Sequence, residues 1–186
     1  IGADWKGRKT GSFGDAAIFS FYATKNLSTG EGGMMLTSND DVREKAFLLA
    51  NQGQKVRYEH PSVGFNYRMT EIEAALGMVQ LSRLDDMNRK RVGNAKFLSE
   101  QLAGVDFISL PAMPKNAKHV FHQYTLRVFG GKRDKLAAHL EKNGVMTRIY
   151  YPKVNYLQPA YANLGVKAGA CPEAEKAAAE VLSIPV

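Results

Sequence analysis

Lys25 is the residue whose type and position could do the most chemistry. It follows an apolar run over residues 16–22, which predicts a buried strand, and it precedes a glycine-rich segment. A lysine amine that is shielded from water gives up its proton more readily, and the free amine can then attack an aldehyde to form a Schiff base. Most lysines are solvated surface charges, so the residue taken alone favours that plainer interpretation.

Two features beside Lys25 could bind a phosphate group. Ser20 ends the predicted strand, where its hydroxyl could donate to a phosphate oxygen or simply bond to nearby backbone. Gly30, Gly32 and Gly33 allow positive φ angles and a close approach of backbone N–H groups to an anion. Neither a Walker A motif nor a dinucleotide-binding G-x-G-x-x-G motif is present, so the glycines by themselves do not identify a ligand.

The histidines and the single cysteine do not suggest a metal centre. His60, His119, His122 and His139 lack the spacing of metal ligands, and we expect no metal site. Cys171 stands alone, so it cannot close an intrachain disulfide or build a thiolate site. We therefore expect a reducing, cytoplasmic setting.

The composition is that of a globular protein. The chain has 186 residues, 45% of them hydrophobic, and 25 Lys and Arg against 18 Asp and Glu give a net charge of +7. No apolar run approaches the roughly 20 residues of a membrane helix, so we expect no membrane partner. The positive charge favours an anionic partner, either a phosphorylated small molecule or a nucleic acid. Because the first residue is Ile1, we expect the chain to be a piece of a longer protein.

Strands and helices are predicted to alternate, which indicates an α/β architecture. A helix capped by Asn39 or Asp40 is expected to end near Gly53, and Thr70 with Glu73 forms a capping box before a long helix. The other predicted elements are strands over residues 34–37, 121–128 and 145–151, and helices over 134–143 and 172–182.

Several motifs, which follow one another along the whole chain, resemble those of the DegT/DnrJ/EryC1/StrS family of pyridoxal-phosphate sugar aminotransferases. They occupy residues 11–15, 19–33, 64–72, 151–152, 157–161, 171–175 and 182–185. The resemblance implies the pyridoxal-phosphate-dependent transferase type I fold, similar to aspartate aminotransferase. Residues 1–86 would be the C-terminal part of the large cofactor-binding domain, and 87–186 the small C-terminal α/β domain, truncated at its end.

The resemblance also implies an activity. The family moves an amino group, most often from glutamate, to a keto group of a nucleotide-linked sugar, with pyridoxal 5'-phosphate as cofactor. We expect the products to feed the synthesis of surface polysaccharides or antibiotic sugars, and we expect no nucleic-acid partner. A dehydratase of the same fold is an alternative, but such relatives carry His in place of the lysine, so Lys25 argues against it.

Five residues stand at positions where the family's motifs carry site residues. Lys25 would bind the cofactor covalently and shuttle a proton, and Ser20 would bind its phosphate. Asn66 would reach the cofactor phosphate of the neighbouring subunit in a homodimer with shared active sites. Arg68 would bind a substrate carboxylate or sugar phosphate, or form a salt bridge at the dimer interface. Tyr156 replaces a histidine found in many members and could still bond a sugar.

One aspartate that the family's mechanism needs is expected upstream of residues 1–186. The family's aspartate that keeps the cofactor ring nitrogen protonated lies upstream of the position matched by Ile1, so we expect the 186-residue piece alone to be inactive. A cofactor-free regulatory or anion-binding protein is a further alternative, with Arg89, Lys90 and Arg91 as its basic surface. No aromatic residue lies among them, which favours a solvated helix face.

Overall fold

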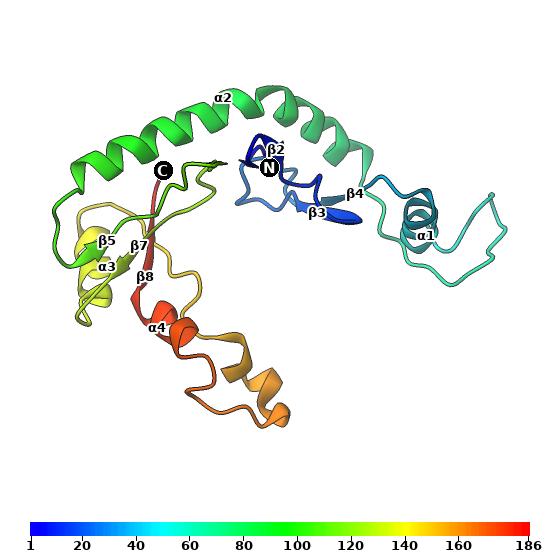
Figure 1. Ribbon diagram of the computed structural model, residues 1–186. Helices are drawn as coiled ribbons and strands as arrows, with labels where there is room; N and C mark the ends of the chain where they lie inside the picture. The colour runs from blue at the N-terminus through cyan, green and yellow to red at the C-terminus, as the bar shows by residue number, and fades with distance from the viewer. The chain divides into compact units, whose positions relative to one another are not determined.

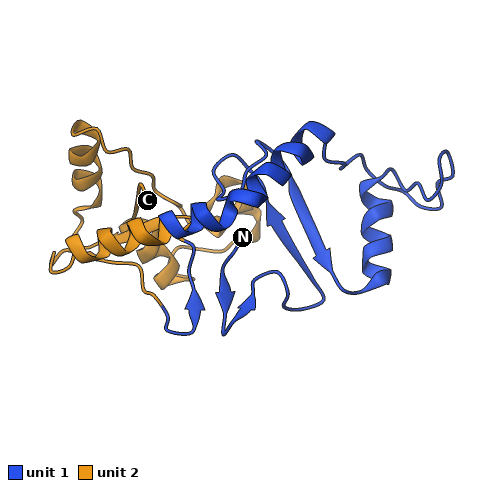
Figure 2. Ribbon diagram, turned by 90° about the horizontal axis from the view of Figure 1, so that it is seen from above, with its two compact units in different colours: residues 1–90, 114–120 blue, residues 91–113, 121–186 orange.

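The computed structural model describes residues 1–186, which form two compact units (Figure 2). Unit 1 comprises residues 1–90 and 114–120, and unit 2 comprises residues 91–113 and 121–186. The chain thus leaves unit 1 after residue 90 and returns to it for one short segment. The domain boundary expected after residue 86 stays a prediction.

Unit 1 contains two small antiparallel sheets. The first has the order β2-β1-β6, and the second pairs β3 with β4 so that Ser20 lies opposite Gly33. Their bounds are β1 (Asp4–Trp5), β2 (Arg8–Lys9), β3 (Ala16–Ser20), β4 (Gly33–Thr37) and β6 (Ala117–Lys118). The 34–37 strand is therefore confirmed, and the strand before the lysine ends at Ser20, so the loop that carries Lys25 begins directly after it.

The helix starts expected in unit 1 are confirmed. α1 (Asp40–Ala50) begins after Asn39, whose Oδ1 accepts hydrogen bonds from the N–H groups of Asp41 and Val42. α2 (Glu71–Gln101) begins after the capping box, in which the Glu73 carboxylate accepts from Thr70 N at 2.9 Å and Thr70 Oγ1 accepts from Glu73 N at 3.2 Å. α2 runs as one helix from unit 1 into unit 2 (Figure 1). Neither α2 nor any other helix is both long and apolar enough to cross a membrane.

The expectation that residues 16–22 form a buried strand is wrong in part. Side chains alternate between the two faces of a strand, and Phe19 and Phe21 turn toward the core of unit 1 while Ile18 is 83% exposed. Ile18 lies on the opposite face of β3, which the rest of residues 1–186 leaves uncovered. The core face packs Phe21 with Leu27 and Leu84, which anchors the loop after β3 to helix α2.

Unit 2 is built around an antiparallel sheet of order β5-β7-β8. Its elements are β5 (Ile108–Ser109), β7 (Tyr124–Val128), α3 (Arg133–Lys142), two 3-10 helices η1 (Asn155–Leu157) and η2 (Pro159–Leu164), α4 (Pro172–Glu180) and β8 (Val181–Ile184). Its buried core comprises Ala95, Phe121, Tyr124, Leu126, Val128 and Leu182. Because inward residues alternate along β7, one face of this strand supplies three of these six side chains.

The strand expected over residues 145–151 is wrong. Arg148 alone pairs there, through its N–H to Ser183 O at 3.0 Å and the reverse bond at 2.7 Å. β8, in contrast, is paired with β7 along its whole length. Ile149 packs against the core of unit 2, whereas Met146 and Tyr151 are exposed, so the stretch forms no regular ladder.

Candidate active site

Lys25 lies in the loop that joins β3 to β4, and its side chain is half-buried. The loop closes on itself through backbone bonds: Lys25 N donates to Tyr22 O at 2.9 Å, and Thr29 N donates to Phe21 O at 2.9 Å. Phe21 N in turn donates to Gly32 O at 2.8 Å. The lysine is thus carried by a closed turn whose base is the end of β3.

Ser20 is the last residue of β3 and is exposed. Its Oγ accepts a hydrogen bond from Tyr22 N at 3.3 Å, so the hydroxyl oxygen is oriented by the same turn that carries Lys25. A hydroxyl that accepts one bond can still donate its own proton outward. Ser20 and Lys25 therefore belong to one local structure, as the sequence predicts.

The glycines of this loop differ in their surroundings. Gly30 has φ +88° and nothing within 4 Å of the place where a Cβ would stand. Gly32 has φ +138°, and a Cβ there would come within 2.7 Å of Thr29 Oγ1 and 2.8 Å of Met69 Cε. The N–H of Gly30 donates to Ser28 Oγ at 3.1 Å and so is already used within the loop. The tight packing at Gly32 requires the absence of a side chain.

Asn26 is a residue that the sequence analysis missed. It is 8% exposed, and its Nδ2 donates to Asn88 Oδ1 at 2.9 Å and to Val120 O at 3.0 Å. These partners are 62 and 94 residues away along the chain, so no local motif or periodicity could pair them. Its place directly after Lys25 was the sole signal in the sequence.

Asn66 and Arg68 lie on an exposed segment that packs along the end of α1. Asn66 pairs with Asn51 in an isolated antiparallel bridge, and Arg68 Nη1 donates to Asn51 Oδ1 at 3.0 Å. The rings of Phe65 and Tyr67 stack at 5.0 Å beside them. The structure therefore places Asn66 and Arg68 together and attaches both to α1, while Ser20 and Lys25 share the β3–β4 loop.

Tyr156 belongs to η1 in unit 2 and already has hydrogen-bond partners. Its hydroxyl donates to the Glu175 carboxylate and accepts from Cys171 N at 3.1 Å. The bond to Glu175 raises the pKa of the Tyr156 hydroxyl, and the same bond, together with one from Gly169 N at 2.6 Å, lowers the pKa of Glu175. Tyr156 thus links the loop before α4 to α4 itself, and its contact with a sugar stays a prediction.

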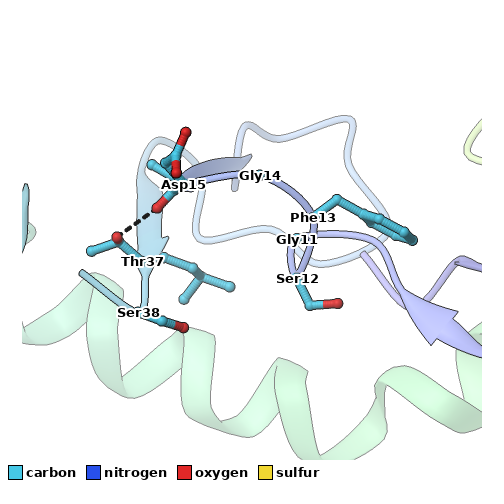
Figure 3. Close-up of a pocket in the computed structure, with 9 residues that line it drawn as sticks. Gly11, Ser12, Phe13, Gly14, Asp15, Thr37 and Ser38 are labelled. Atoms are coloured by element: carbon cyan, nitrogen blue, oxygen red, sulfur yellow. Dashed lines mark hydrogen bonds between the residues drawn. The ribbon is translucent and has the colours of Figure 1, made fainter.

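The motif over residues 11–15 lines a small cavity at the other end of β3 (Figure 3). The cavity measures about 250 Å³ and is closed on one side by Thr37, whose hydroxyl donates to Asp15 O at 2.6 Å. None of the five predicted site residues lines it. No group of three or more His, Cys, Asp or Glu residues is arranged to hold a metal ion.

Comparison with known families and proteins gives consistent results. The sequence model described as the DegT/DnrJ/EryC1/StrS aminotransferase family matches residues 1–186. A pleiotropic regulatory protein of Geobacillus stearothermophilus is 42% identical over 190 residues, which cover 100% of this chain and 50% of that protein. A dTDP-3-amino-3,4,6-trideoxy-alpha-D-glucose transaminase of Streptomyces venezuelae is 37% identical, over 100% of this chain and 48% of that protein.

A solved structure is similar along the whole chain as well. The crystal structure of DesV from S. venezuelae in complex with a ketimine intermediate superposes with a TM-score of 0.95 at 36% identity, over 100% of this chain and 50% of that one. The expected fold class, part of a type I transferase fold, is thereby confirmed. The chain spans about half the length of the relatives that it matches.

Proposed function

Because the chain belongs to the DegT/DnrJ/EryC1/StrS aminotransferase family, we propose that the whole protein transfers an amino group to a keto group of a nucleotide-linked sugar. The cofactor that the family and its structural neighbours indicate is pyridoxal phosphate. The observation that carries the proposal is the half-buried residue Lys25 on a closed turn that also orients Ser20. A nucleotide sugar as acceptor is supported by the name of the Streptomyces transaminase and by the chain's net charge of +7.

The residues of the β3–β4 loop fit this cofactor by their chemistry. Lys25 supplies a primary amine for an aldehyde, and Ser20 supplies a hydroxyl donor for a phosphate. When bound, the cofactor ring withdraws electrons and stabilises negative charge on the substrate carbon. Lys25 Nζ would hold the cofactor through its aldehyde at rest and, once free, would move a proton between the substrate carbon and carbon C4′ of the cofactor.

The remaining predicted residues receive their roles as part of the same proposal. Asn66 would donate to the cofactor phosphate of a neighbouring subunit, since its segment is exposed and attached to α1. Arg68 would bind an anionic group of the substrate with the part of its guanidinium that does not contact Asn51. Tyr156 would bond the sugar through its remaining acceptor capacity. The active protein would then be a homodimer with shared sites.

We propose further that glutamate is the amino donor, that the protein works in the cytoplasm, and that its product enters polysaccharide or antibiotic-sugar synthesis. The carboxylate that faces the cofactor ring nitrogen would come from outside residues 1–186. Asp4 and Asp15 are the acids near the start of the chain, and neither stands at the motif position that carries this carboxylate in the family. We therefore expect the 186-residue piece alone to be inactive.

The test uses the protein expressed from its complete gene. Pyridoxal phosphate is added, and the absorbance spectrum is recorded before and after borohydride for the wild type, Lys25→Ala and Lys45→Ala. Lys45 is an exposed lysine on α1 and serves as the matched control. We expect a near-visible band that borohydride fixes covalently in the wild type and in Lys45→Ala but not in Lys25→Ala. A folded wild-type protein without this band would contradict the proposal and favour a cofactor-free regulatory role.

A further inference from the structure

The residue after Lys25 is buried although the residues before the lysine are not. Tyr22, Ala23 and Thr24 are exposed, whereas Asn26 is 8% exposed and Leu27 is 2% exposed. The burial of Leu27 is explained by its apolar side chain, which packs in the core of unit 1. A buried asparagine needs hydrogen-bond partners instead, because its amide would otherwise lose those it had in water.

The contacts of Asn26 fix the orientation of its amide. Nδ2 donates to two oxygens, Asn88 Oδ1 at 2.9 Å and Val120 O at 3.0 Å. Rotating the amide by 180° would turn an oxygen toward both acceptors, so only one orientation is possible. Asn88 is itself 1% exposed, and its Nδ2 donates to Ile1 O at 3.3 Å. Asn26 thereby attaches the loop by hydrogen bonds both to α2 and to the segment 114–120.

This arrangement leaves one polar atom without a donor. Asn26 Oδ1 is buried and accepts no hydrogen bond. Such an atom is unfavourable for stability, and an apolar side chain at this position would avoid it. Leu27 already anchors the loop to the core, so the two bonds from Asn26 Nδ2 are not needed for that attachment. We therefore look for their role in the neighbouring residue, Lys25.

We propose that Asn26 is a positioning residue for Lys25, an inference that rests on the proposed function. The amide bonds hold residue 26 against α2 and the segment 114–120, and residue 25 is one peptide unit away. The direction in which Lys25 Nζ leaves the loop is thus set by Asn26, while its distance from Ser20 is set by the turn at Tyr22. Loss of the Asn26 bonds would allow the loop to rotate about the Leu27 anchor.

Variants of the full-length protein separate positioning from general stability. Asn26→Asp keeps the shape of the side chain but turns an acceptor-only carboxylate toward two oxygens. Asn88→Ala removes one acceptor of Asn26 from a residue on another element. Asn94→Ala, an exposed asparagine on the same helix, is the matched control. Thermal unfolding of each variant shows whether it is folded.

The primary readout is the rate of covalent attachment of pyridoxal phosphate to Lys25, trapped with borohydride and quantified by peptide mass spectrometry. The second readout is the non-covalent affinity for the same compound, measured with each change introduced into a Lys25→Ala background. We expect Asn26→Asp and Asn88→Ala to slow attachment by about 10- to 100-fold, because a displacement near 1 Å has effects of that size. We expect the non-covalent affinity to change by less than about twofold, since the phosphate donors stay in place.

Three results would overturn the inference. A rate of attachment within about twofold of the wild-type rate in both variants would show that Lys25 does not need the Asn26 hydrogen bonds. A parallel loss of attachment and non-covalent affinity would indicate general damage to the loop. If Asn26→Asp does not fold, Asn88→Ala decides the matter alone. Absence of attachment in the folded wild type would refute the proposed function itself, and with it this role of Asn26.

Discussion

Substitution of Gly32 by alanine should disturb the Lys25 loop through contacts that the structure identifies. The φ angle of +138° is strained for any residue with a side chain, at a cost of about 1–3 kcal/mol. The added Cβ would also approach Thr29 Oγ1 to 2.7 Å and Met69 Cε to 2.8 Å. Met69 can move its flexible end, but Thr29 is buried and its hydroxyl donates to Glu31 O, so its movement costs about 1 kcal/mol more.

The matched control for this substitution is Gly30→Ala in the same loop. Gly30 has φ +88° and open space around its Cβ position, so alanine there costs about 1–2 kcal/mol from the backbone alone. Urea unfolding should therefore show a loss of about 2–4 kcal/mol for Gly32→Ala and a smaller loss for Gly30→Ala. Equal losses for the two variants would refute the reasoning, since they would show that Thr29 and Met69 relax without penalty.

Three further predictions concern other parts of the chain. Tyr124→Phe should lower the free energy of unfolding by about 1 kcal/mol, because the buried hydroxyl shares a hydrogen bond with Ser99 Oγ at 2.8 Å. A double-mutant cycle with Ser99→Ala should show coupling between the two substitutions, and strict additivity would contradict it. Glu175→Gln should remove a stabilisation that the wild type loses in acid. The hydrogen bond from Tyr156 lowers the pKa of Glu175, so the charged Glu175 stabilises the fold above about pH 4.5, and this stabilisation is lost as the pH falls through the lowered pKa. Melting temperatures of the two proteins should converge in acid, and a constant difference would exclude this link. Thr70→Ala should cost about 1 kcal/mol in urea unfolding through loss of the α2 cap, and an unchanged midpoint would count against the capping box.

Local patterns predicted the features whose partners are close in sequence. The Thr70 and Glu73 capping box spans three residues, and Asn39 caps α1 through its neighbours Asp41 and Val42. Side-chain chemistry and hydrogen bonding at these sites are decided within one helical turn. The sequence therefore contains all the information that such features require.

Features that depend on distant partners could not be predicted in this way. Asn26 is buried by residues 62 and 94 positions away, and no spacing rule relates them. The stretch 145–151 has the apolar content of a strand, but Arg148 pairs with Ser183 in a single bridge. Ile18 is apolar yet exposed, because it lies on the face of β3 that the rest of residues 1–186 leaves uncovered. In each case the tertiary environment overrides the local preference.

The central claim is that Lys25 binds the cofactor, and peptide mapping tests it most directly. The full-length protein is incubated with pyridoxal phosphate, reduced with borohydride, digested and analysed by mass spectrometry. The account predicts one reduced pyridoxyl adduct, on the peptide that contains Lys25, and its disappearance in Lys25→Ala. An adduct on another lysine, or none in the folded protein, would contradict the account.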